Sequence, residues 1–294
     1  MDIIEQLSTA LAERLVSVAP AVVALRLGPR LRAGILWRPD VIVTSEQTIG
    51  DRDSMTVVHA GIEVAAKLAG RDPGTNVAVL RLETPLSGAL PAPAGQPRAG
   101  SLAMIAGADV HGAATGRLAM VHSVGPEWYS MAGGRIDGLI RLDARLGADE
   151  GGPVLDQSGG LLGMSTSGPR RRVLVIPTAT IARVVDPLLA NGRIARGWLG
   201  VGLQPVAVPD NLQARAGQTR GAMVLSLVTG APADQAGVMA GDILLDIDGS
   251  PFGQRRRLTT ILNPERIGKV ITVRLLRAGD AKTVSLTIAA RPYG

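Results

Sequence analysis

Apolar residues near the start of the chain recur at three- and four-residue spacing. The positions with this spacing are Ile4, Leu7, Leu11 and Leu15. Such a period predicts an amphipathic α-helix over residues 1–19, ending near Ala19-Pro20. We expect this helix to pack on the domain that follows, and a role in binding a partner or a second copy of the chain stays open.

After residue 20 the pattern changes to short apolar runs separated by Gly and Pro. The runs cover residues 21–27, 32–37, 41–44, 55–59, 77–82, 102–106, 116–123, 138–142, 161–165 and 173–176. A dense series of short strands predicts a closed barrel or a sandwich. Apolar residues at helical spacing then predict a helix over 178–189, which stops at Asn191-Gly192.

A second series of elements follows a short linker at 193–196. We expect strands at 198–204, 223–228, 243–248, 270–276 and 283–289, a helical turn after Ala231-Pro232, and a helix over 254–263. About 100 residues suffice for an independent domain. The chain is therefore predicted to be mainly β, with two domains.

Composition and charge exclude some classes of partner. The net charge is +6, but basic residues are spread beside 25 acidic ones, and the chain has only one Phe, two Tyr and three Trp. A groove that stacks single-stranded nucleic acid needs more aromatic side chains, so we expect no nucleic-acid partner. Binding of an anionic polymer through Arg170–Arg172 and Arg255–Arg257 stays open as an alternative.

No metal site or cofactor is expected. The chain has no Cys, and His59, His111 and His122 stand alone in the sequence, without the paired spacing of metal ligands. Asp143, Asp149 and Glu150 form a loose acidic group, which we interpret as solvated carboxylates.

The N-terminal residues lack the basic start of a secretory signal, and charged residues interrupt the apolar positions. No stretch approaches the roughly 18 apolar residues of a membrane-spanning helix. These patterns predict a cytoplasmic protein without a membrane partner.

The C-terminal part carries the most specific motif. The stretch GAPADQAGVMAGDILLDIDG, from Gly230 to Gly249, resembles the PDZ domains of HtrA/Deg-type serine proteases nearly position by position. Upstream, Arg196 to Val201 resembles the family's carboxylate-binding loop, and Arg277 to Asp280 its last hairpin. The resemblance implies a PDZ domain over residues 197–294.

Such a domain implies a site for protein C-termini or extended peptide segments. Backbone N–H groups of a glycine-containing loop converge on the terminal carboxylate, and the next strand pairs with the peptide. The loop residues are Trp198, Leu199, Gly200 and Val201, and the facing helix carries Leu258, Ile261 and Leu262. The alternative is that these are core residues and the groove is unused.

The first part of the chain resembles the trypsin-like domain that precedes PDZ in the same family. Gly151-Gly152-Pro153 resembles the motif after the nucleophilic serine, residues 41–44 the strand before the catalytic histidine, and residues 75–82 the segment with the catalytic aspartate. The resemblance implies a double barrel over residues 20–192. It also places Gln47, Asn76 and Glu150 at the three catalytic positions.

These substitutions remove the chemistry of acyl transfer, which needs a hydroxyl nucleophile, an imidazole base and a carboxylate that orients the imidazole. We therefore expect no catalytic residue and no enzyme activity. The expected function is recognition, as an adaptor, a regulatory subunit of an active relative or a chaperone-like holder; a homo-oligomer stays open. The alternative is a serine endopeptidase-like hydrolase with residual activity.

The resemblance also implies where the side chain of Glu150 lies. In active relatives the backbone N–H groups at the positions of Ala148 and Glu150 form the oxyanion hole. We expect the Glu150 carboxylate to turn back onto these donors or to reach Arg170, Arg171 or Arg172. The alternative is a solvated side chain above a collapsed hole.

Overall fold

The computed structural model describes residues 2–169, 172–252 and 261–292, and the chain divides into two compact units, Met1–Ile194 and Ala195–Gly294. The boundary falls inside the linker indicated by the sequence. The first unit holds two closed barrels and the second an antiparallel sheet, so the predicted mainly β fold is confirmed.

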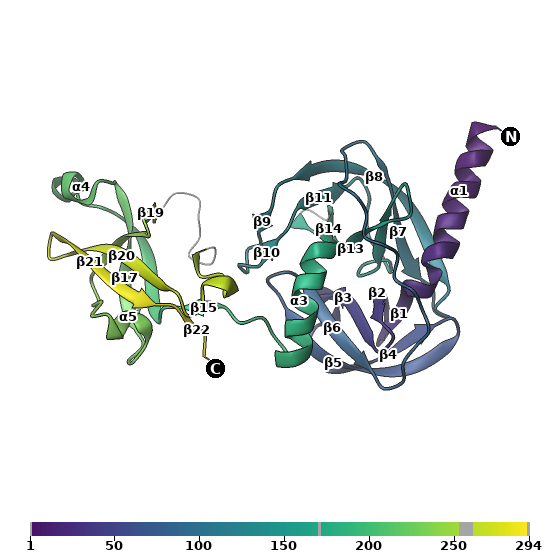
Figure 1. The fold of residues 1–294 in the computed structure, drawn as a ribbon, viewed down its shortest axis with the longest axis horizontal. Helices are drawn as coiled ribbons and strands as arrows, with labels where there is room; N and C mark the ends of the chain where they lie inside the picture. The colour runs from purple at the N-terminus through teal and green to yellow at the C-terminus, as the bar shows by residue number, and fades with distance from the viewer. Residues whose placement is uncertain (1, 170–171, 253–260, 293–294) are drawn as a thin grey trace. The chain divides into compact units, whose positions relative to one another are not determined.

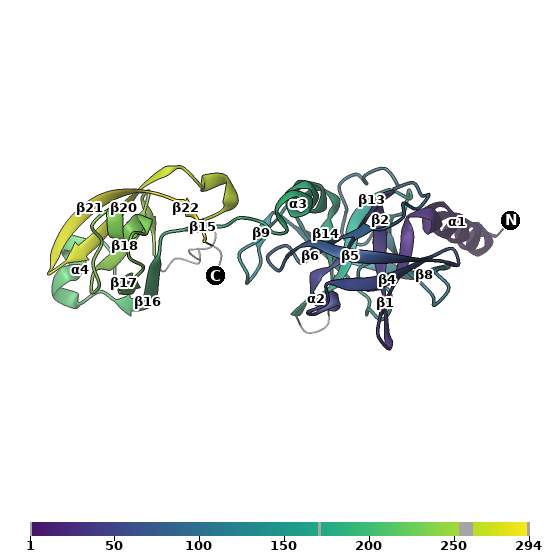
Figure 2. The ribbon, with the colours of Figure 1, turned by 90° about the horizontal axis from the view of Figure 1, so that it is seen from below.

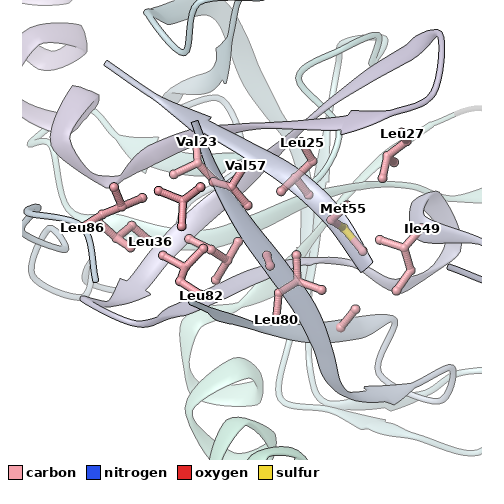
Figure 3. Packing of buried hydrophobic residues seen from close by; sticks show 14 residues of the cluster. Val23, Leu25, Leu27, Leu36, Ile49, Met55, Val57, Leu80, Leu82 and Leu86 are labelled. Atoms are coloured by element: carbon pink, nitrogen blue, oxygen red, sulfur yellow. The ribbon is translucent and has the colours of Figure 1, made fainter. Parts of the chain in front are cut away.

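The first barrel closes in the order β1-β2-β3-β6-β5-β4 (Figure 1). Its strands are β1 (Val22–Leu27), β2 (Arg30–Arg38), β3 (Val41–Ser45), β4 (Ser54–His59), β5 (Ile62–Asp72) and β6 (Val77–Leu82). Leu25, Val57 and Leu80 fill its interior (Figure 3). All of β3 is buried because its two faces meet different layers, the barrel interior and helix α3 (Thr178–Asn191).

The second barrel closes in the order β11-β14-β13-β12-β7-β8. Figure 2 labels three of its strands, β8, β13 and β14. Its strands are β7 (Leu102–Ala108), β8 (Ala114–Gly125), β11 (Leu139–Leu142), β12 (Pro153–Asp156), β13 (Leu161–Ser167) and β14 (Val173–Pro177). A small hairpin of β9 (Trp128–Tyr129) and β10 (Arg135–Ile136) joins β8 to β11. Helix α3 ends at Gly192 in the left-handed conformation, as the sequence predicts.

Helix α1 (Ile3–Val18) begins the chain and α2 (Glu46–Ile49) follows β3 directly. The C-terminal half of α1 packs on the second barrel through Leu11, Leu15 and Val18, whereas Ile3 and Ile4 are exposed. Across the described ranges, no helix combines the length and apolar character needed to cross a membrane.

The second unit is built on a sheet in the order β16-β17-β18-β20-β21, with β19 (Ser250–Pro251) beside β18. Its main strands are β16 (Val201–Ala207), β17 (Arg220–Leu227), β18 (Ile243–Ile247), β20 (Val270–Arg277) and β21 (Asp280–Thr287). Its other elements are β15 (Gly197–Trp198), paired with β22 (Ala289–Ala290), α4 (Asp210–Ala216), α5 (Pro232–Gln235) and a 3₁₀ turn at Pro264–Arg266.

The start of this unit differs from the sequence prediction. The single strand predicted at 198–204 is wrong, because Gly200 has φ +76° and separates β15 from β16. The helix predicted at 254–263 lies mostly outside the described residues.

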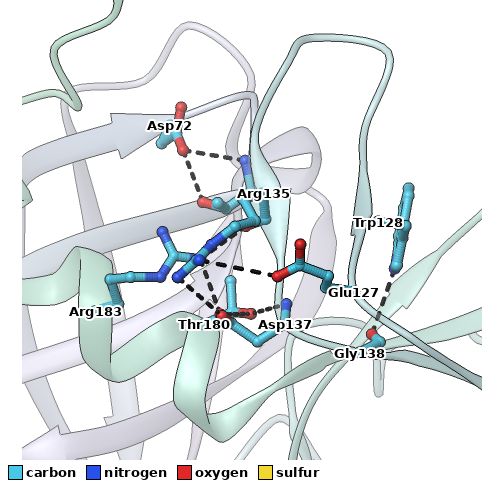
Figure 4. A network of polar contacts seen from close by, with 9 residues as sticks. Asp72, Glu127, Trp128, Arg135, Asp137, Gly138, Thr180 and Arg183 are labelled. Carbon is cyan, nitrogen blue, oxygen red and sulfur yellow. Dashed lines mark hydrogen bonds and ion pairs between the residues drawn. The ribbon is translucent and has the colours of Figure 1, made fainter. Parts of the chain in front are cut away.

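A polar network fastens the β9–β10 hairpin to α3 (Figure 4). The Asp137 carboxylate accepts hydrogen bonds from Thr180 Oγ1 at 2.7 Å and from Arg183 at 2.8 Å, and it pairs with Arg135 at 3.2 Å. Burial alone would raise the pKa of Asp137, but the hydrogen bonds from Arg183 and Thr180 and the charges of Arg183 and Arg135 hold the pKa below its ordinary value.

A carboxyl group whose pKa is lowered by folding stabilises the protein above its unfolded pKa, and this contribution is lost as the pH falls through the folded pKa. Asp137→Asn should therefore lower the free energy of unfolding of the first unit by about 1–2 kcal/mol at pH 7. The difference should shrink below about pH 4. Urea denaturation at pH 7 and pH 3 checks this, with Glu83→Gln in an exposed ion pair as the control. A difference that does not change with pH would contradict the assignment.

Candidate functional site

The structure brings Gln47, Asn76 and Glu150 together. Gln47 lies on α2, Asn76 immediately before β6, and Glu150 shortly before β12. The backbone N–H of Gln47 donates to Asn76 Oδ1 at 2.9 Å, and its side-chain Nε2 donates to Glu150 Oε1 at 2.6 Å. Residues about 30 and 100 positions apart in the sequence thus form one hydrogen-bonded site.

The turn before β6 sets the position of Asn76. The Asp72 carboxylate accepts hydrogen bonds from the N–H groups of Gly74 and Thr75, each at 3.1 Å. Asn76 then takes φ +57°, a left-handed conformation that Asn tolerates better than most residues. Its side chain consequently faces α2, where it bonds to Gln47.

A close backbone approach positions Glu150. Gly151 has φ +92°, and a Cβ there would lie 2.3 Å from Thr44 Oγ1, so only glycine fits. Next to Glu150, the Asp149 carboxylate pairs with Arg117 at 2.8 Å and accepts the Gly147 N–H at 2.6 Å. Both contacts fix the loop that carries Glu150.

Thr166 on β13 lies at the centre of the site. Its Oγ1 accepts hydrogen bonds from Asn76 Nδ2 at 2.5 Å and from Gln47 Nε2 at 3.1 Å, and it lies 3.0 Å from Ser45 Oγ. Ser45 Oγ in turn lies 3.3 Å from Asn76 Oδ1. Sequence reasoning missed Thr166 and Ser45, because hydroxyls in buried strands carry no motif of their own.

The Glu150 residue is only 8% exposed. Besides Gln47, its Oε1 accepts the backbone N–H of Ser167 at 3.0 Å. The Glu150 carboxylate is therefore held by a backbone N–H, as expected, but the donor is Ser167 and not one of the expected oxyanion-hole positions. The N–H of Glu150 itself donates to Gly147 O at 3.4 Å. No ion pair joins Glu150 to Arg172 in the part of the chain that the structure describes, and Arg170 and Arg171 lie outside it.

The predicted solvated acidic group is also wrong for two of its members. Asp149 and Glu150 are buried and hydrogen-bonded, since the loop turns them towards Arg117 and β13, whereas Asp143 is exposed. A buried carboxylate needs such donors to offset the loss of water.

The side chains at the site are hydrogen-bonded to one another. The amides of Gln47 and Asn76 cannot act as bases near neutral pH, and the hydroxyls of Ser45 and Thr166 are buried within hydrogen bonds. The ring nitrogens of His59 face the carbonyl oxygens of Val22 and Ser87, so His59 does not take part in this site. The contacts connect α2, the turn before β6, the loop before β12 and β13 in one site.

In the second unit, the predicted loop connects β15 to β16. Its carbonyl groups are bonded inwards: Leu199 O accepts the Ala233 N–H at 3.0 Å and Gly200 O accepts the Val228 N–H at 2.9 Å. A Cβ on Gly200 would lie 2.1 Å from the Ala231 Cβ. The following strand, β16, is at the edge of the sheet.

The structure places the other predicted peptide-binding residues differently. Ile261 and Leu262 are buried in the core with Leu199, while Trp198 and Val201 are partly exposed. Leu258 lies outside the described residues, as do Arg255, Arg256 and Arg257. The loop and the β16 edge are therefore the parts of the predicted peptide site that the structure describes.

Comparisons with known proteins agree with this architecture. Residues 32–164 match the trypsin-like peptidase domain and residues 197–288 match the PDZ domain. A probable periplasmic serine endoprotease, DegP-like, from Brucella suis is 30% identical over 262 residues, which cover 85% of this chain and 50% of that protein. Its counterpart from Rhizobium meliloti is 28% identical, covering 91% of this chain and 55% of that protein. The chain spans about half the length of these curated relatives.

Solved structures show the same fold. The HtrA-type protease AlgW with a decapeptide superposes with a TM-score of 0.73 at 22% identity, covering 97% of this chain and 99% of the other. The serine endoprotease from Yersinia pestis gives 0.69 at 24% identity, covering 96% and 98%.

The predicted cytoplasmic location is wrong. The relatives from Brucella and Rhizobium are periplasmic by name, which points to the periplasm. The charged residues that suggested a cytoplasmic start belong to α1, a helix packed on the second barrel, and hence say nothing about the compartment.

The central position of Thr166 yields a test. Thr166→Val keeps the shape but leaves the amide of Asn76 without its acceptor, and should lower the free energy of unfolding by about 1–3 kcal/mol. Thr166→Ser, which keeps the hydroxyl, should lose less than half as much. Urea denaturation of both variants checks this. Equal losses would show that the methyl group contributes as much as the hydroxyl, which would contradict the assigned role of the hydroxyl.

Proposed function

Because the chain belongs to the HtrA/DegP-like family, in which a trypsin-like domain precedes a PDZ domain, we propose that it is a non-catalytic member that binds peptides. The observation that carries this proposal is the mutual bonding of Gln47, Asn76 and Glu150 where the family places its triad. The ligand class is a protein C-terminus or an extended segment, and the proposed compartment is the periplasm. An active relative as a second partner stays a prediction.

The site supports the proposal in two ways. First, a carboxylate replaces the serine hydroxyl, and a carboxylate is a poor attacker of an amide. Second, the Glu150 N–H, one of the two expected oxyanion donors, points to Gly147 O within its own loop. Removing a single oxyanion donor costs about 10²–10³ in rate in enzymes that keep their triad.

The PDZ loop supports peptide binding. Gly200 in the left-handed conformation belongs to the kind of backbone arrangement whose N–H groups converge on an anion. The edge position of β16 offers an unpaired side to an extended peptide. The similar AlgW structure is one with a decapeptide, which favours the same role here.

The rival proposal is a hydrolase, favoured by the names of the relatives, which are serine endoproteases. The two proposals predict different results with unfolded casein between pH 6 and pH 9. We expect no peptide release, because no described group supplies a nucleophile and a base. Purified DegP-like protein from Brucella suis serves as the positive control. Turnover that disappears in Glu150→Ala would establish the hydrolase instead.

Peptide binding has its own test. A peptide with an apolar last residue and a free carboxylate should bind at least about tenfold tighter than its amidated form, a difference of about 1.4 kcal/mol. Gly200→Ala should weaken binding, because its Cβ would meet Ala231. Fluorescence anisotropy measures both effects, with Gly249→Ala, a glycine with open space around it, as the matched control. Equal affinity for the acid and the amide would show that the loop does not bind the terminal carboxylate.

A further inference from the structure

One edge of β13 changes neighbours along its length. Strand β12 pairs with it only as far as Met164. The loop before β12 then continues the pairing: Ser165 N–H donates to Gly152 O at 2.9 Å, and Gly151 N–H donates to Ser165 O at 3.0 Å. In an antiparallel ladder, every second residue turns its N–H and C=O to the same neighbour. The next residue that faces this edge is therefore Ser167.

At Ser167, side chains instead of a neighbouring main chain form the hydrogen bonds of this edge. Its N–H donates to Glu150 Oε1 at 3.0 Å, and its carbonyl oxygen accepts a hydrogen bond from Gln47 Nε2 at 3.0 Å. The other edge of Ser167 is paired with Val173 on β14. Glu150 and Gln47 thus supply one acceptor and one donor, which is the pair of groups that the main chain of a neighbouring strand would supply.

We propose that Gln47 and Glu150 form a plug that imitates a bound main chain and closes a latent peptide-pairing edge at Ser167. The plug consists of these two side chains and their hydrogen bond at 2.6 Å. The ligand class is an unfolded polypeptide in extended conformation, held by its main chain and hence with little sequence preference. This inference rests on the proposed function only in that a peptide bound there is not cleaved.

The energetics make the plug displaceable. An incoming peptide restores both hydrogen bonds at Ser167, and the released Glu150 carboxylate regains water, so few polar groups lose a partner overall. Two contacts oppose displacement. Gln47 Nε2 also lies 3.1 Å from Thr166 Oγ1, and its backbone N–H is fixed by Asn76. The closed state is therefore favoured in the free protein and competes directly with peptide.

A binding experiment with an amidated probe tests the plug apart from the PDZ loop. The probe is a fluorescein-labelled β-casein peptide with an amidated C-terminus, and the variant is the double substitution Gln47→Ala and Glu150→Ala. We expect the variant to bind the probe at least about tenfold tighter than the wild-type chain. The matched control is Glu83→Ala, which removes an exposed ion pair with Lys67 and should bind like the wild type.

Equal affinity of the wild type and a folded double variant would overturn the plug. Should the double variant not fold, amide hydrogen exchange at Ser167 decides: Glu150→Ala should speed exchange at least about tenfold, and Glu150→Gln, which keeps an acceptor, should change it less. Unchanged exchange in Glu150→Ala would overturn the plug. Cleavage of the probe by the wild type would overturn only the non-catalytic function.

Discussion

The rest of the site depends on one constraint: the Glu150 carboxylate is buried between two barrels and must be compensated there. Its donors are the Ser167 N–H on β13 and the Gln47 amide on α2, so one comes from the second barrel and the other from the end of a first-barrel strand. The same contacts hold α2 against β13. Glu150 is thereby a structural link between the two halves of the first unit.

The surrounding framework gives this link a fixed geometry. Gly151 passes too close to Thr44 for any other residue, and Arg117 anchors Asp149 beside it. On the opposite side, the turn capped by Asp72 presents Asn76 in a left-handed conformation. Thr166 joins the side chains of Asn76 and Gln47 in one network, and Gln47 connects this network to Glu150.

The mainly β class, α3 and the two-unit division follow from the sequence, because apolar periodicity and Gly-rich turns act locally. The pattern alone left a barrel or a sandwich open, and the resemblance to the family implied the double barrel. Strand β5 was missed, since its exposed positions such as Glu63 and Lys67 interrupt the apolar run. Resemblance to the family identified Gln47, Asn76 and Glu150, but the partners of Glu150 could not be predicted. They depend on how β13 lies beside α2, which is a tertiary relation that no local pattern encodes.

The proposed non-catalytic function requires that the mutually bonded polar groups between the barrels form no covalent bond of the acyl-enzyme type. The most direct measurement is intact-mass spectrometry after incubation with a fluorophosphonate, a reagent that labels activated serine hydroxyls. The account predicts that the mass of the chain stays unchanged, while the DegP-like relative from Brucella suis gains one adduct under the same conditions. Stoichiometric labelling of this chain would contradict the account.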